Sequence, residues 1–171
     1  MMNVMAKAAQ EGSSELPQIK QALEQSGMAA KSANVAFEET NSAIQVLDKA
    51  GKKGSEGGVA LRNVLATLGQ GRFLPKEVQA EFQKLGIKIN DLNDPSQTLS
   101  QRLNHLKPLL KDSALMSATF GKENANAAMA LIGQTAEMDR LTTAVKGTNS
   151  AYEQAAIVME GPEEKNARLK A

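Results

Sequence analysis

The sequence has no cysteine and no tryptophan, and it holds a single histidine among its 171 residues. Without cysteine, the chain cannot form disulfides, thiolate metal sites or a cysteine nucleophile. One histidine is too few for a standard zinc site. Aromatic residues make up only 3% of the chain, so its core must come from Leu, Ile, Val, Met and Ala, and we expect modest stability.

Neither sign of charge is in excess, since the formal net charge is +1. This balance gives no indication of contact with nucleic acid or with an anionic membrane surface. No apolar run approaches the roughly 20 residues that span a bilayer, and the polar first residues do not resemble a signal peptide. The length suffices for one domain with its own core, and 42% hydrophobic residues argue against wholesale disorder.

Apolar residues recur at helical spacing along most of the chain, as in the steps of three and four between Leu16, Ile19 and Leu23. The pattern predicts an all-α fold, an irregular bundle of seven or eight short amphipathic helices with an extended C-terminal helix. The expected helices cover residues 3–12, 16–32, 37–50, 55–70, 75–85, 95–119, 122–146 and 150–170.

Proline and glycine mark the expected helix ends. Pro108 should kink the helix of residues 95–119 or divide it near Lys107, because its ring blocks the preceding turn. Asp94-Pro95-Ser96-Gln97 has the order of an N-cap, a first-turn proline and a third-position glutamine. Gly51 and Gly86 stand where a left-handed residue would end the helix before them.

The glycine-rich stretch of residues 51–58 superficially resembles a phosphate-binding loop. Such a loop follows a strand and places Lys and then Ser or Thr after its last glycine. Here a predicted helix comes first, and Gly54 is followed directly by Ser55. We therefore favour a tight helix-to-helix turn in which Ser55 caps the next helix and Gly57 and Gly58 allow close packing.

Two further polar features invite a chemical interpretation. Counted from Asp91, a calcium loop would need an acidic or amide residue at its fifth position and glycine at its sixth, where Pro95 and Ser96 stand. A polar turn is the better interpretation there. The lone His105 lacks the Gly-x-Ser-x-Gly elbow of a serine hydrolase and is expected on the surface or rim. The sequence thus predicts no catalytic residue, no metal site and no cofactor.

The eight methionines leave two interpretations open. Met is flexible and polarisable, so it fills irregular gaps in an Ala-rich core, and it also lines adaptable protein-binding faces. The eight include Met116, Met129, Met138 and Met159.

Three segments, in order along the chain, resemble the core of the phage tail tape measure protein family. The first lies within residues 34–65, the second within 85–91, and the third begins at residue 120. The residues that carry the resemblance are Gly51, Gly54, Ser55, Gly58, Leu61, Arg62, Leu85, Gly86, Ile87, Asp91, Phe120 and Gly121. By analogy with the family, Arg62 should pair with a carboxylate or a carbonyl of a neighbouring helix, although a solvated charge is the alternative.

Among the departures from the family pattern, two bear on helix stability. Ala36 stands where a capping serine is usual, so the helix after it should start less firmly, by about 1 kcal/mol. Gly57 stands where the family usually has alanine, which lowers helix propensity by about 1 kcal/mol.

The resemblance implies a structural segment of a tape measure protein that sets tail length and supports tail tube assembly, without catalytic activity. Its partners would be tail tube and tail assembly proteins and further copies of itself, and it would reside in the virion tail after synthesis in the host cytoplasm. We expect a prophage-encoded fragment with N-terminal helices (1–34), a tape measure core helical domain (35–147) and a C-terminal helical extension (148–171).

Two other classes of protein could share this composition. The alternative is a helical protein-interaction or adaptor module, also without catalytic activity, although the glycine cluster and prolines argue against a long coiled coil. A peptidoglycan-cleaving enzyme, of the kind that occurs fused within tape measure proteins, would need a nucleophile or metal ligands that this sequence does not supply.

Overall fold

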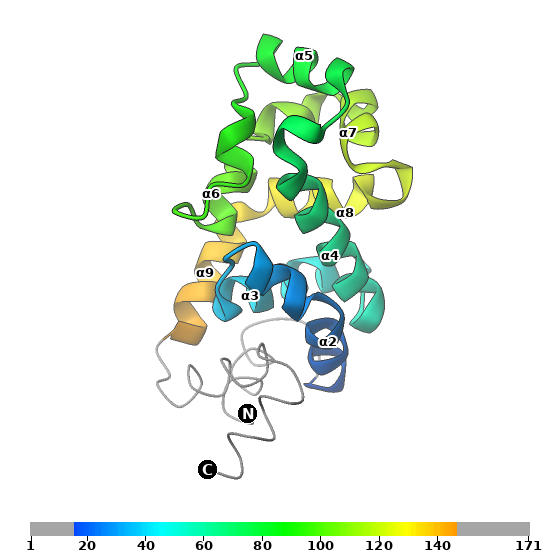
Figure 1. Cartoon of the computed structure of the whole chain (residues 1–171). Helices are drawn as coiled ribbons and strands as arrows, with labels where there is room; N and C mark the ends of the chain where they lie inside the picture. Colours follow the sequence, from blue (N-terminus) through cyan, green and yellow to red (C-terminus); the bar gives the residue numbers. More distant parts are fainter. Residues whose placement is uncertain (1–15, 147–171) are drawn as a thin grey trace.

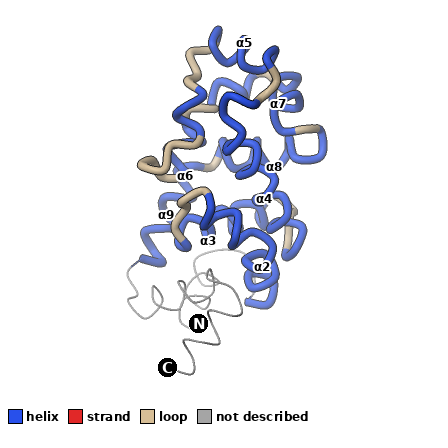
Figure 2. Tube along the Cα trace, viewed as in Figure 1, coloured by secondary structure: helices blue, strands red, loops and turns tan. Residues whose placement is uncertain are grey.

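The computed structural model describes residues 16–146, and over that range the chain is all-α (Figure 1). Figure 2 shows helix along most of the described range, with loops at the connections. The eight α-helices of residues 16–146 are α2 (Leu16–Ser32), α3 (Phe37–Lys49), α4 (Gly54–Gln70), α5 (Lys76–Lys84), α6 (Leu99–Asn104), α7 (Ser113–Phe120), α8 (Lys122–Gly133) and α9 (Thr135–Lys146). Three short 3-10 helices are η1 (Gly71–Phe73), η2 (Ile89–Leu92) and η3 (Lys107–Lys111).

The predicted all-α bundle of seven or eight short helices is confirmed. The expected helices 3–12 and 150–170, and with them the extension 148–171, lie outside the described residues. The division of the chain at residues 34 and 147 stays a prediction.

Helix α4 links the two ends of the elongated structure (Figure 1). At one end it packs along α2, while α3 packs against both of them and against α9. Toward the other end α4 meets α7 and α8, and α5 lies beyond, at the top of the view. Segments far apart in sequence are thus brought together around one central helix.

One continuous hydrophobic core runs through the described helices, from Ile19 in α2 to Val145 in α9. It is aliphatic, as the composition predicts: Phe37, Phe82 and Phe120 are buried, whereas Phe73 is 75% exposed. The methionines, which could fill the core or line a binding face, are also divided between buried and exposed positions. Met116 and Met138 are core residues, Met129 is 38% exposed, and Met159 lies outside the described residues.

Several predicted helix ends are confirmed. Gly51 and Gly86 have positive φ angles of 94° and 76° and follow the last turns of α3 and α5. Pro108 does interrupt the helical run: α6 ends at Asn104, and Pro108 falls in the first turn of η3. The chain becomes α-helical again only at Ser113.

The predicted helix start at Asp94-Pro95 is wrong. The Asp94 carboxylate accepts hydrogen bonds from the backbone N–H and the hydroxyl of Ser96, at 2.9 and 2.7 Å, so it closes a local turn and caps no helix. Helix α6 begins at Leu99 instead. Its N-cap is Thr98, which forms a reciprocal capping box with Gln101.

The predicted single helix 122–146 is also wrong, because it is divided at Gln134, whose ψ of 29° with φ −121° is not helical. Gly133 weakens the helix just before the break. Thr135 then donates a 2.6 Å hydrogen bond to the Asn104 side chain. Beyond this break, α9 packs against α3 and α6.

The start of α3 is supported from within the helix. Ala36 has no side-chain acceptor, but the Glu39 carboxylate accepts from the Ala36 N–H at 3.2 Å. This is one half of a capping box, and it offsets part of the expected loss.

Candidate interaction site

The residues singled out from the sequence occupy turns and packing positions throughout the fold. At the α3–α4 turn, Gly51 and Gly54 both adopt positive φ. A side chain on Gly54 would place its Cβ 2.8 Å from Gln21 Oε1 of α2. Ser55 is exposed, and the N-cap of α4 is Lys53, which makes no side-chain capping bond. The predicted capping role of Ser55 is therefore wrong.

Gly58 is the point of closest approach between α2 and α4. A Cβ at Gly58 would lie 2.8 Å from both Ala22 Cα and Gln25 Cβ. Leu61, one turn later, is fully buried in the core. The predicted close packing at Gly58 is confirmed, and glycine is required there by the backbone of the neighbouring helix.

Within residues 16–146, Arg62 does not form the expected pair with a carboxylate or a carbonyl of a neighbouring helix. Its side chain is exposed, and it forms no ion pair or hydrogen bond with another residue of the described range. A solvated charge, the alternative raised from the sequence, describes it better.

The second and third signature segments are also structural. Leu85 is 40% exposed, whereas Ile87 is buried and donates its N–H to Phe82 O across the Gly86 turn. Phe120 is buried at the end of α7, and Gly121, with φ 83°, directs the chain into α8. Most of the twelve signature residues thus serve turns or packing, whereas Ser55 and Arg62 are exposed, and the set does not converge on one cleft.

Asp91 and His105 meet in a polar network on the rim. His105 Nε2 lies 2.8 Å from Gln97 Oε1, and His105 Nδ1 is 4.0 Å from Asp91 Oδ2. Gln97 Nε2 donates to Asp94 Oδ2 at 3.3 Å. These contacts fit the rim position expected for His105. No group of three His, Cys, Asp or Glu in the described range is arranged to hold a metal ion.

The residue that the sequence interpretation missed is Arg102 of α6. It is only 2% exposed and is the sole buried Lys or Arg in residues 17–145. Its Nη1 donates to Ala33 O at 2.8 Å and its Nε to Gln97 O at 3.1 Å. The signal was present in the sequence, since Arg102 lies three residues after Leu99 and four before Leu106, on the apolar stripe of its helix.

Two other side chains complete this junction. Asn34 Nδ2 donates to Pro95 O at 2.8 Å, and the Glu39 carboxylate accepts from Leu99 N at 2.6 Å. We call the hydrogen bonds of Asn34, Glu39 and Arg102 to residues across this junction the polar latch. The latch joins the α2–α3 turn to the segment 95–102, some 60 residues later in the chain.

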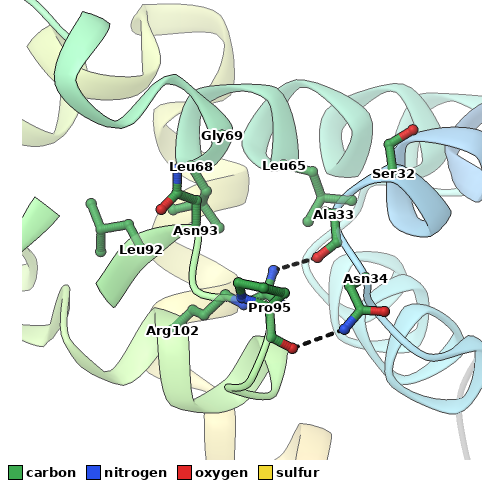
Figure 3. Close-up of a pocket in the computed structure, with 10 residues that line it drawn as sticks. All are labelled: Ser32, Ala33, Asn34, Leu65, Leu68, Gly69, Leu92, Asn93, Pro95 and Arg102. Atoms are coloured by element: carbon green, nitrogen blue, oxygen red, sulfur yellow. Dashed lines mark hydrogen bonds between the residues drawn. The ribbon is translucent and has the colours of Figure 1, made fainter. Parts of the chain in front are cut away.

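A pocket of about 280 Å³ lies beside the polar latch (Figure 3). It is lined by Ser32, Ala33, Asn34, Leu65, Leu68, Gly69, Leu92, Asn93, Pro95 and Arg102. A second pocket, of about 330 Å³, shares Ser32, Ala33, Leu65 and Gly69 with it and adds Ala29, Ala66 and Gln70. The two pockets adjoin at the C-terminal ends of α2 and α4 through these shared residues.

Comparison with known families decides the assignment. A sequence model of a family described as phage-related minor tail protein matches residues 1–160, which is nearly the whole chain. The chain belongs to this family.

A more specific likeness is to the tape measure protein of Pneumococcus phage Dp-1. The present chain and that protein are 24% identical over 165 residues, which cover 92% of the present chain and 14% of the relative. The chain therefore spans about one seventh of the length of the tape measure protein that it matches. No solved structure matches the chain.

Membership of the minor tail protein family supports a structural role in a phage tail. The observed geometry agrees with such a role, because most of the signature residues serve turns and helix packing. Among the described residues no helix is both long and apolar enough to cross a membrane.

Proposed function

We propose that this chain is a folded helical segment of a tape measure protein, which sets tail length and supports assembly of the tail tube around it. The observation that carries the proposal is the likeness to a tape measure protein along 92% of the chain. The proposed partners are the tail tube protein, other tail assembly proteins and further copies of the chain. Synthesis in the host cytoplasm and incorporation into the virion tail belong to the same proposal.

The described fold bears on how such a segment would act. As one continuous helix, 171 residues would extend over about 250 Å, whereas a compact domain of this length has a radius of gyration of about 15 Å. Contacts between distant segments, such as the polar latch, favour the compact state. We infer that the segment works as a folded module unless tail assembly pulls it open.

The proposal assigns no catalytic step to the chain. Family membership supports a structural role, and the residues that distinguish the chain serve its packing. Incubation of the full chain with purified cell walls should leave them intact, and a cleared zone would contradict this part of the proposal.

The test is an in-frame deletion of residues 35–145 from the parent gene, followed by electron microscopy of the tails. If the segment is a stretched ruler, tails should shorten by about 170 Å, at 1.5 Å for each deleted residue. If it is a folded assembly module, tails should be absent. Infectious tails of unchanged length would overturn the tape measure proposal in favour of an adaptor.

A further inference from the structure

Arg102 is a buried charge whose donors are not all used. Of its three nitrogens, Nε and Nη1 each donate to a main-chain carbonyl, while Nη2 is buried without a hydrogen-bond partner. An unmet donor on a buried charged group is costly, so such a group is expected to have a partner. Figure 3 shows Arg102 beside Pro95, with Ala33 and Asn34 on the facing wall of the pocket.

The nearest carboxylates do not supply that partner. Both oxygens of Glu39 accept backbone N–H groups, from Ala36 and Leu99. Asp94 is engaged with Ser96. Glu39 and Asp94 therefore act on Arg102 only through space, and within the described range the guanidinium forms no ion pair of its own. A buried guanidinium without a directly bound anion favours an incoming one.

The pocket beside Arg102 has the size and lining to receive such a group. Its volume of about 280 Å³ is in the range of a side chain and too small for a helix. Leu65, Leu68 and Leu92 supply apolar walls that can contact methylene groups. Asn93, whose side chain makes no hydrogen bond within the described range, lies at the same pocket and can add a second donor.

We propose that this pocket binds the carboxylate of an acidic side chain carried by a partner protein, with Arg102 Nη2 as the principal donor. The carboxylate accepts the free N–H groups of a guanidinium already held in place by two carbonyls. The adjoining depression, walled by Ala29, Ala66 and Gly69, gives the partner backbone room to approach. The apolar walls favour a side chain with methylene groups over a bare inorganic anion. The inference stands whether or not the chain sets tail length.

The first test uses three probes on the full 171-residue chain, followed by NMR of the Arg102 Nε–H and the Gly69 amide. The probes are N-acetyl-glutamate N-methylamide, the matching glutamine compound and inorganic phosphate. We expect saturable shifts with the glutamate compound and binding at least about tenfold weaker with the glutamine compound, because a charge-assisted hydrogen bond is lost. Phosphate should bind more weakly than the glutamate compound.

Each other result overturns the proposal. Equal binding of the glutamate and glutamine compounds would mean that the carboxylate is not recognised. Tighter binding of phosphate would make this a site for a free anion. The absence of any shift would mean that the pocket does not bind a carboxylate.

The second test blocks the pocket without touching Arg102. Gly69 lies on α4 at both pockets, and a Cβ there would meet no atom within 4 Å, so Gly69→Leu should fold normally and occupy the depression. Gly133→Leu is the matched control, since Gly133 is also helical, exposed and free of close neighbours but lies on α8. We expect Gly69→Leu to weaken binding of the glutamate compound by at least about tenfold and Gly133→Leu to leave it unchanged. Unaltered binding by Gly69→Leu would exclude this pocket as the site.

Discussion

The two ends of the α2–α4 pair differ in what the helices leave between them. The helices run in the same direction, with Gly58 against Ala22 near their starts and Gly69 near Ser32 and Ala33 at their other ends. At Gly58 the backbones touch and no side chain fits. At Gly69 the helices have separated and leave a depression. The same residue type thus closes one end of the pair and opens the other.

The surroundings of the two ends also differ. The closed end depends on contact between the backbones of α2 and α4 at Ala22 and Gly58. Beside the open end lies the polar latch, which joins the α2–α3 turn and Glu39 of α3 to the segment 95–102. The backbone contact at Gly58 tolerates no added atom, whereas a hydrogen-bonded junction beside a pocket can accept a further partner. The closed end therefore serves stability and the open end is the better place for recognition.

The largest expected effect is that of Gly58→Ala. Its new Cβ would meet the backbone of Ala22, which must shift, so we expect a loss of about 2 kcal/mol of unfolding free energy despite the better helix propensity of alanine. Urea unfolding followed by circular dichroism measures the change. A neutral or stabilising result would show that the helices separate at little cost and would remove the distinction between the two ends.

The matched change at the open end is Gly69→Ala, which should act in the opposite direction. The Cβ enters free space in the last turns of a helix, so we expect a gain of up to about 1 kcal/mol from reduced backbone freedom. The same urea experiment measures it. Since the two sites are about 16 Å apart along α4 at 1.5 Å per residue, the double variant should show additive effects. A marked departure from additivity would mean that the two ends move together.

These glycines also show how far the sequence could predict the fold and the site. Gly51, Gly58 and Gly86 were predictable because a turn or a close approach restricts the residue type at one position. The turn at Asp94 and the break at Gln134 could not be predicted from the sequence. Asp94 and Thr135 can each form more than one local hydrogen-bonding pattern, and tertiary contacts determine which one forms. Arg102 was visible as a charge on an apolar stripe, but the pocket beside it is formed by segments from four parts of the chain.

A smaller effect is expected at a surface contact away from the α2–α4 pair. Glu137 of α9 accepts from Arg140 at 2.7 and 2.9 Å and from Lys49 of α3 at 3.0 Å. Arg140, followed by Lys49, lowers the pKa of Glu137 from an ordinary 4.5 to about 2. This contribution to stability is therefore present above pH 4.5 and is lost as the pH falls through about 2.

Glu137→Gln tests that contribution. Because the carboxylate is on the surface and screened, its removal should cost less than about 1 kcal/mol at pH 7, and the cost should shrink in high salt and at pH 2. Urea unfolding at the two pH values checks this. Gly58→Ala is the control, because its effect involves no ionisable group and should be the same at both pH values. An equal acid dependence in both variants would mean that acid acts on the fold as a whole.

The smallest effect is expected at Asp94, next to the open end. Hydrogen bonds from the Ser96 hydroxyl and N–H lower the pKa of Asp94 below 3.8. The turn that precedes Thr98 and Arg102 is thus supported above pH 3.8 and loses that support as the pH falls through the lowered pKa. NMR titration of the Ser96 amide should show a midpoint below 3.8, and Ser96→Ala should raise that midpoint because it removes the hydroxyl donor.

If acid weakens this turn, the shifts of the Gly69 amide should follow the same titration while those of Gly58 do not. If both amides titrate in parallel, the two ends of the helix pair respond as one unit. That result would contradict the distinction between the closely packed end at Gly58 and the open end at Gly69.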